Sequence, residues 1–161
     1  MIKAFVSLTQ QNKYIINAVV FQLKGDSKMN EYKIGDTYKI EAVVSEEALA
    51  CNVGSGSLRV YATPMVVALI EKAASQMAQT LVEEGITTVG TRIAIDHVSA
   101  TPLGAKVWAE VTLKEIDGRK FVFDVSAFDE SGLIAKGEHE RFSVKSESFQ
   151  KKADAKLASQ S

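Results

Sequence analysis

One stretch of the sequence, residues 63–85, has the marks of a long helix and limits how the rest of the chain can fold. Thr63 can cap the first free N–H groups, Pro64 suits a first helical position that needs no donor, and Gly85 can take the left-handed conformation that ends a helix. At about 100° per residue, one side of this helix is apolar, formed by Val66, Ile70, Ala73, Ala74, Met77 and Leu81. The sequence therefore predicts a helix over residues 63–85 with one buried side.

Glu71 lies in the first half of this predicted helix, where the neighbouring residues are mostly apolar. Met65 and Leu69 fall on the side that becomes polar only in the second half, so the helix is expected to enter the protein buried all round. The residues one turn before and after Glu71 are Val67, Ala68, Ala74 and Ser75. Most helical glutamates are solvated, but this position predicts a largely buried carboxylate.

Strand patterns precede and follow the helix. Apolar and polar residues alternate over residues 38–44, and four further strands are predicted at 91–98, 106–116, 120–129 and 133–144. Short turns such as Asp117-Gly118 make the later neighbours antiparallel, while residues 45–59 read as a loop rich in Gly, Ser and Asn. A sheet with one apolar face needs a cover, and the long helix is the one available. We therefore predict an α+β protein in which about five antiparallel strands wrap around one central helix, the arrangement called a hot-dog fold.

Chain length and composition indicate one folded domain. The 161 residues carry a formal charge of -1, and 46% are apolar. We assign this domain to residues 31–145, preceded by an N-terminal extension, residues 1–30, and followed by a tail, residues 146–161, that forms a short helix or is disordered. Because a sheet of this size has free edges, we expect a homodimer.

Composition also bounds the partners and the location. The near-neutral charge and the lack of a Lys/Arg-rich run argue against a nucleic-acid partner. No apolar run is long enough to span a membrane, so no membrane partner is expected. A single cysteine, Cys51, excludes an internal disulfide and fits a reducing compartment, so we expect a cytoplasmic protein. No residue cluster has metal-ligand spacing and no Gly-rich phosphate loop is present, so neither a metal nor a cofactor is expected.

Three polar residues are candidates for catalysis, although each also has an ordinary structural interpretation. Thr63 can be a helix cap, Glu71 a solvated helix residue, and His97 a histidine of the core, since strand alternation places it with Ile93 and Ile95. No one of these residues decides the function, and their combination has to be considered.

The combination resembles a known family. The segments at 60–73, 89–91 and 97–104, with Val125-Ser126-Ala127-Phe128-Asp129 and Gly137-Glu138-His139-Glu140-Arg141 in the same register, are similar to the fluoroacetyl-CoA thioesterase-like branch of the hot-dog thioesterases. The resemblance covers about residues 33–150. It implies that Thr63, Glu71 and His97 are the catalytic residues and that Gly90 lies at the acyl end of a substrate pocket. Arg141 also matches a family arginine, and it can equally be the partner of a nearby acidic residue.

The resemblance implies an acyl-CoA thioesterase, and the residue types fit thioester hydrolysis. Glu71 can act as a base or attack directly, His97 can move protons near neutral pH, and Thr63 can orient water or substrate. Ser57 occupies the position where the family's namesake has a bulky aromatic residue of its lid, which favours a general short or medium acyl-CoA substrate. The alternative from another class is a non-catalytic acyl-CoA or small-ligand binding protein with the same fold, but such a pocket does not need a carboxylate and an imidazole beside apolar walls.

Overall fold

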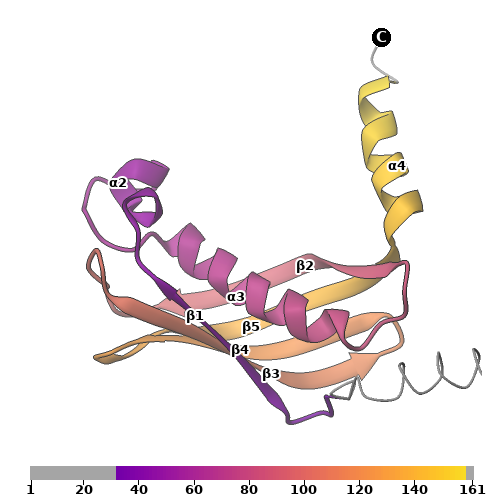
Figure 1. Ribbon diagram of the computed structural model, residues 1–161, viewed down its shortest axis with the longest axis horizontal. Coiled ribbons are helices and arrows are strands. Elements are labelled where there is room, and N and C mark those ends of the chain that lie inside the picture. Colours follow the sequence, from indigo (N-terminus) through magenta and orange to yellow (C-terminus); the bar gives the residue numbers. More distant parts are fainter. Residues whose placement is uncertain (1–31, 159–161) are drawn as a thin grey trace, which may run out of the picture. The chain divides into compact units, whose positions relative to one another are not determined.

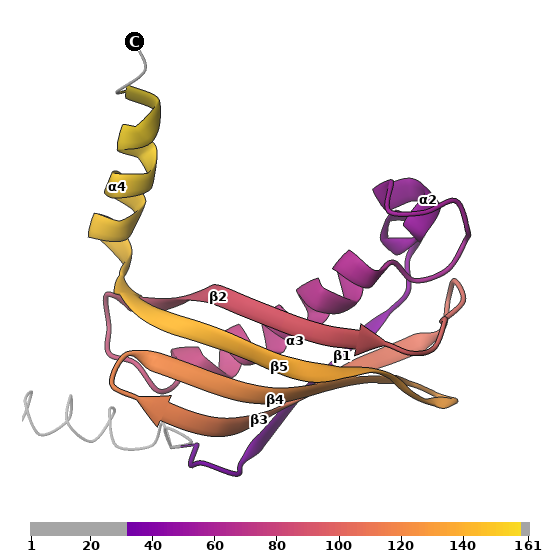
Figure 2. The same cartoon turned by 180° about the vertical axis from the view of Figure 1, so that it is seen from behind.

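The computed structural model describes residues 32–158, so the predicted N-terminal extension, residues 1–30, lies outside the described residues. Five antiparallel strands form one sheet in the spatial order β1-β3-β4-β5-β2. The strands are β1 (Thr37–Val43), β2 (Ile86–His97), β3 (Lys106–Asp117), β4 (Lys120–Asp129) and β5 (Gly132–Lys145). The long helix α3 (Thr63–Gln79) lies along one face of this sheet (Figure 1), and Figure 2 shows the sheet in front of it. The predicted α+β hot-dog fold is confirmed.

The sheet has one apolar face and one charged face because its strands alternate. On β3 the residues Val107, Ala109, Val111 and Leu113 are buried against α3. The next residue, Lys114, points to the opposite face, where its Nζ lies 3.0 Å from Asp124 of β4 and 3.0 Å from Glu138 of β5. Ion pairs on this exposed face add little stability. The hydrophobic core therefore lies between the sheet and α3.

Helix α3 packs the apolar side that the sequence predicts. Val66, Ile70, Ala73, Ala74 and Met77 are all completely buried. The helix ends earlier than predicted, at Gln79, and Gly85 adopts its left-handed conformation (φ +81°) in the turn before β2. At its end the backbone tightens, because the N–H groups of Thr80 and Leu81 donate to the carbonyls three residues back, at 3.2 and 3.0 Å. The Gln79 side chain accepts a hydrogen bond from Thr87 Oγ1 (3.1 Å) and donates to the Ile86 carbonyl (3.0 Å). These bonds hold the start of β2 beside the end of α3.

Three further segments differ from the sequence interpretation. Residues 45–59, predicted as a loop, contain the short helices η1 (Glu46–Ala48) and α2 (Ala50–Val53). Strand β2 starts at Ile86, five residues before the predicted start, because this segment pairs in register with the end of β5. The tail, for which a short helix was one of two predictions, forms helix α4 (Ser146–Ala158).

No helix within residues 32–158 combines the length and the apolar character needed to cross a membrane.

Candidate active site

Thr63 is the first residue of α3, and its hydroxyl is used differently from the prediction. The residue at the cap position is Ala62, which offers no side-chain cap, and Pro64 occupies the first turn. Thr63 Oγ1 instead lies 2.9 Å from His97 Nδ1, at the end of β2. The hydrogen bond joins the start of the helix to the last residue of an edge strand. The predicted capping role of Thr63 is therefore wrong, and its pairing with His97 takes that place.

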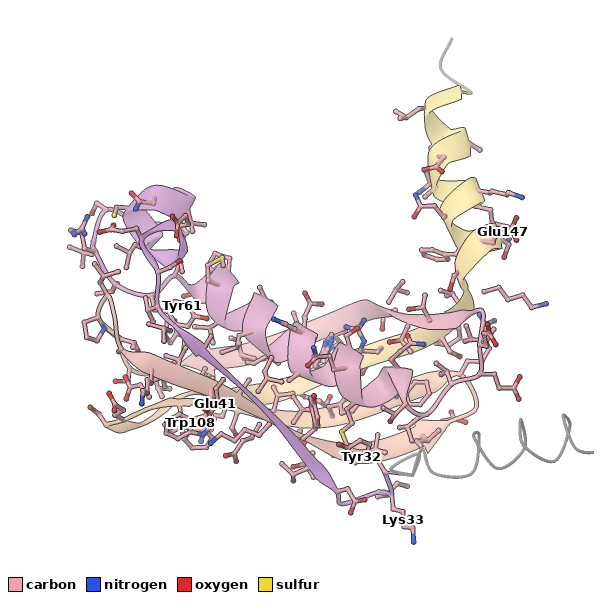
Figure 3. The ribbon with its side chains drawn as sticks, in the orientation of Figure 1. Tyr32, Lys33, Glu41, Tyr61, Trp108 and Glu147 are labelled. Carbon is pink, nitrogen blue, oxygen red and sulfur yellow. The ribbon has the colours of Figure 1, made fainter. Side chains whose placement is uncertain are left out.

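Thr63 and His97 line a cavity of about 310 Å³ between the start of α3 and the segment after β2. Tyr61, labelled in Figure 3, lies where the chain enters α3; its hydroxyl donates to the Met65 carbonyl at 3.0 Å, and burial raises its pKa to about 12. Tyr61 is therefore neutral at physiological pH. The remaining lining is mostly small, with Ala50, Ser55, Val60, Ala62, Val98, Ser99 and Ala100.

His97 has a nitrogen that the protein leaves without a partner. Its Nδ1 bonds Thr63, but Nε2 is buried and, in the part of the chain that the structure describes, is the one buried side-chain nitrogen or oxygen with no hydrogen-bond partner. Such groups are rare in folded proteins and cost free energy. An imidazole held on one side and unsatisfied on the other is suited to exchange a proton or a hydrogen bond with a bound molecule.

Glu71 lies against β2 at Gly90. A Cβ atom on Gly90 would be 2.5 Å from Glu71 Oε1, so this position has room for the carboxylate only because the residue is glycine. The register between β2 and β5 shifts between Gly90 and Arg92, which marks a β-bulge beside the carboxylate. The Glu71 side chain keeps 42% of its accessible surface, so it is half-buried in a single chain and not largely buried as predicted.

Arg141 and His139 lie behind Glu71 on β5. Arg141 is buried and anchored: its Nε donates to Thr88 Oγ1 at 2.9 Å and its Nη2 donates to the Thr88 carbonyl at 2.8 Å. His139 is completely buried, and its Nδ1 donates to the Arg92 carbonyl at 2.8 Å. That bond leaves His139 Nε2 as an acceptor for Arg141 Nη1 at 3.2 Å. Glu71 Oε1 lies 3.8 Å from the same Nε2. Burial lowers the pKa of Arg141, and the negative charge of Glu71 opposes this shift, so the two charges act on each other.

Burial lowers the pKa of His139 below its usual value of 6.5, and the positive charge of Arg141 lowers it further. The unfolded chain therefore binds a proton at a pH where folded His139 remains neutral. The resulting stability is complete above about pH 6.5 and falls as the pH decreases toward the folded pKa. In this pH window, the unfolding free energy of the natural protein should fall more steeply than that of His139→Gln. The difference between the two slopes should be up to about 1.4 kcal/mol per pH unit. Urea unfolding between pH 7.5 and pH 5 measures this, and equal slopes in the two proteins would contradict it.

The six predicted site residues fall into two groups and one outlier. Thr63 and His97 form the first pair, while Glu71, Gly90 and Arg141 meet at the middle of β2. The eight helical residues between Thr63 and Glu71 correspond to about 12 Å of helix rise. Among residues 32–158, neither Thr63 nor His97 is hydrogen-bonded to Glu71. Ser57 is exposed in the segment between α2 and α3 and does not line the cavity, whereas Ser55 does.

Sequence reasoning did not assign a role to Thr88 or His139, although both support the position of Glu71. Residues 139 and 141 alternate onto one face of β5, and Thr88 and Gly90 do the same on β2. If the pairing of Gly90 with Arg141 had been predicted, it would have placed these four residues next to one another. The missing signal was the register, because residues 86–90 of β2 were not recognised as strand.

Comparisons with known proteins identify relatives of this chain in sequence and in fold. The family model described as fluoroacetyl-CoA-specific thioesterase matches residues 44–147. A fluoroacetyl-CoA thioesterase of Streptantibioticus cattleyicolor is 35% identical over 97 residues, which cover 60% of this chain and 70% of that protein. The structure of the fluoroacetyl-CoA thioesterase FlK superposes with a TM-score of 0.74 at 28% identity and covers 79% of this chain and 98% of FlK. A Thermus thermophilus member of the thioesterase superfamily shares the fold, with a TM-score of 0.72 at 23% identity, over 81% of this chain and 98% of that one.

Proposed function

Because the chain belongs to the fluoroacetyl-CoA-specific thioesterase family, we propose that it hydrolyses short or medium acyl-CoA thioesters to free acid and CoA through Thr63, Glu71 and His97. The observation that carries this proposal is the hydrogen bond between Thr63 and His97 in a cavity, with His97 Nε2 left unsatisfied. The limited volume of this cavity, about 310 Å³, supports a short or medium acyl group.

The residues supply the groups that thioester hydrolysis needs. One water molecule is consumed: its oxygen becomes part of the acid, the C–S bond breaks, and the thiolate leaves with a proton. Glu71 either takes the proton from the attacking water or attacks the carbonyl carbon to give an anhydride that water then opens. His97 exchanges protons, Thr63 orients the imidazole, and the positive end of α3 faces the carbonyl oxygen as it gains negative charge. Gly90 leaves room for the carboxylate and Arg141 balances its charge.

The active form we propose is a homodimer with a site at the subunit contact. Strands β1 and β2 are the edges of the described sheet, and Glu71 lies half-exposed beside β2. A second copy against β2 would cover the carboxylate and bring a second Thr63–His97 pair toward it, which would overcome the separation along one helix. Light scattering should give twice the 17.5 kDa chain mass. A fully active monomer at low concentration would contradict this arrangement.

We assign the protein to the cytoplasm. Cys51 is a free cysteine within the described residues, and unpaired thiols are typical of reducing compartments. Fractionation of cells with an antibody against the chain tests this assignment, and recovery outside the cytoplasmic fraction would exclude it.

A screen of acyl-CoA chain lengths with detection of the released thiol tests the function. We expect hydrolysis of short or medium acyl-CoA thioesters and a decline with longer chains, because the cavity at Thr63 and His97 is small. Fluoroacetyl-CoA belongs in the panel because the family relatives carry that name. Binding of acyl-CoA without release of thiol at any length would favour the non-catalytic alternative, a binding protein that kept the fold.

A further inference from the structure

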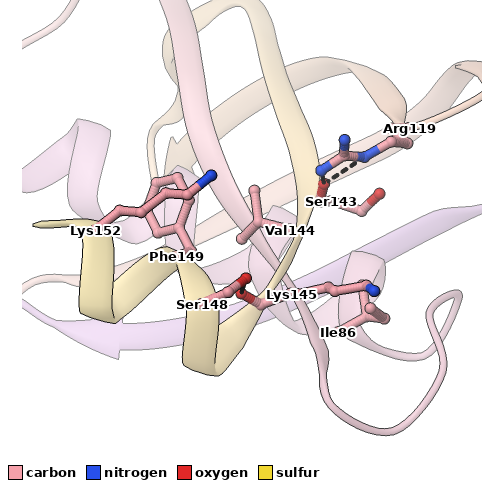
Figure 4. A pocket seen from close by; sticks show the side chains of 8 residues that line it. All are labelled: Ile86, Arg119, Ser143, Val144, Lys145, Ser148, Phe149 and Lys152. Atoms are coloured by element: carbon pink, nitrogen blue, oxygen red, sulfur yellow. Dashed lines mark hydrogen bonds between the residues drawn. The ribbon is translucent and has the colours of Figure 1, made fainter.

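A second cavity lies where β5 passes into α4 (Figure 4), and it differs from the Thr63–His97 cavity in size and charge. It has a volume of about 530 Å³, and its lining residues come from three secondary-structure elements and one turn. Ile86 comes from the start of β2, Arg119 from the turn before β4, Lys145 from the end of β5, and Phe149 and Lys152 from α4. The catalytic assignment above uses none of these residues.

The lining of this second cavity is strongly positive. It includes Arg119, Lys145 and Lys152 and no carboxylate. Arg119 is fixed by Nε and Nη2, which both donate to the Ser143 carbonyl, at 2.9 and 2.5 Å, and this leaves Nη1 available. In the described chain, the amines of Lys145 and Lys152 take part in no ion pair or hydrogen bond, whereas Lys114, Lys120 and Lys151 all have carboxylate partners. Three cations without counter-charges attract a multiply charged anion.

An aromatic ring accompanies the positive charge. Phe149 lies in the first half of α4, borders the cavity and keeps 45% of its surface exposed. An exposed ring beside phosphate-binding cations is a surface on which a nucleobase can stack. A cavity of about 500 Å³ at the opposite edge of the sheet, beside β1 and β3, also has an aromatic residue, Trp108, but its lining includes Glu41 and Glu130. The charge therefore favours the β5–α4 cavity for a nucleotide.

The distance from the catalytic carboxylate is suitable for CoA. Ile86 pairs with Lys145 and Gly90 with Arg141 in an unbroken register, so these side-chain positions share one face of the β2–β5 pair. Gly90 lies four residues after Ile86, a rise of about 13 Å along the strand. The pantetheine arm has about thirteen bonds between sulfur and the first phosphorus and spans about 15 Å when extended, at three bonds per 3.3–3.6 Å. One molecule can thus reach both places.

We propose that the β5–α4 cavity binds the 3′-phosphorylated ADP end of CoA, with Arg119, Lys145 and Lys152 on the phosphates and Phe149 under the adenine, while the thioester lies at Glu71. This inference rests on the proposed function, because it assumes an acyl-CoA substrate. It assigns a nucleotide-binding role to the C-terminal helix α4.

The test uses the full chain and a double variant, Lys145→Glu with Lys152→Glu. Calorimetric titration with adenosine 3′,5′-bisphosphate should show at least about tenfold weaker binding, since each charge-assisted contact is lost. Lys33→Glu with Lys136→Glu makes the same change in net charge at two other exposed lysines and should leave the affinity unchanged. Phe149→Ala should weaken binding of the bisphosphate but not of inorganic pyrophosphate. Equal affinity of the natural protein and the double variant overturns the proposal.

Kinetics separate this inference from the proposed function. For an acyl-CoA, the double variant should raise KM about tenfold or more with kcat nearly constant. For the matching acyl-pantetheine, which lacks the nucleotide, KM and kcat should both be unchanged. If the double variant hydrolyses both thioesters with the KM and kcat of the natural protein, the nucleotide site is overturned and the proposed thioesterase function stands. Nucleotide binding that depends on the lysines, without hydrolysis of any thioester, overturns the thioesterase and retains the site.

Discussion

Replacing Glu71 by Gln is expected to lower kcat for an acyl-CoA substrate by about 10²-fold or more while the protein stays folded. The amide has nearly the same shape as the carboxylate but cannot take a proton from water or attack a carbonyl carbon. The side chain is 42% exposed, and the buried Arg141 guanidinium keeps its hydrogen bonds to the hydroxyl and the carbonyl of Thr88 in this variant, so the protein is expected to stay folded. Steady-state kinetics with thiol detection, combined with thermal unfolding, measures both expectations.

The companion change is His97→Ala, which removes the imidazole that bonds Thr63 and should also lower kcat by about 10²-fold. Thr63→Val should cost less, because it removes the orientation of the ring but not the ring. His97→Ala and Thr63→Val are both expected to bind acyl-CoA. If Glu71→Gln and His97→Ala proteins remain folded and bind substrate, yet hydrolyse it at the natural rate, the mechanism proposed for these residues is wrong.

The fold could be predicted from local patterns because its strands and its helix are strongly periodic. The alternation on β3 and the apolar side of α3 both appear in the structure as read from the sequence. Boundaries were less accurate where contacts distant in sequence decide them. Strand β2 starts at Ile86 and not at residue 91, because Ile86 pairs with Lys145 at the end of β5. A local pattern contains no information about such a contact.

The candidate site shows the same limit. Thr63 stands where the sequence predicts a helix cap, yet its hydroxyl forms a hydrogen bond with His97, which is 34 residues away. Glu71 has apolar helical neighbours, but it faces an edge strand, so a single chain leaves it half-exposed. The roles of Thr88 and His139 depend on the register between β2 and β5. Residue types were predictable here, while the partners of those residues were not.

Gly90→Ala is expected to lower kcat by about 10²-fold with a change in unfolding free energy of less than about 1 kcal/mol. The added Cβ would lie 2.5 Å from Glu71 Oε1 and 3.2 Å from His139 Cε1, so the carboxylate has to move. Glu71 can move at little cost because the clash is with the end of a flexible, half-exposed side chain, and Gly90 does not have a positive φ. A displacement of about 1 Å is enough for an effect of this size on a catalytic group. Kinetics and urea unfolding on the same preparation measure the two quantities.

Two other glycines provide the controls. In Gly137→Ala the Cβ would lie 2.0 Å from the backbone oxygen of Ala94, so the pairing of β2 with β5 must shift and the protein should lose stability as well as activity. In Gly56→Ala the nearest atom would be Ala50 Cβ at 3.5 Å, an ordinary contact, and neither stability nor kcat should change. A Gly90→Ala protein that is as stable and as active as Gly56→Ala would show that the position of the Glu71 carboxylate beside β2 does not matter for hydrolysis. A Gly90→Ala protein as unstable as Gly137→Ala would show that the glycine serves the fold, because then the neighbouring side chains cannot yield and the effect on catalysis is indirect.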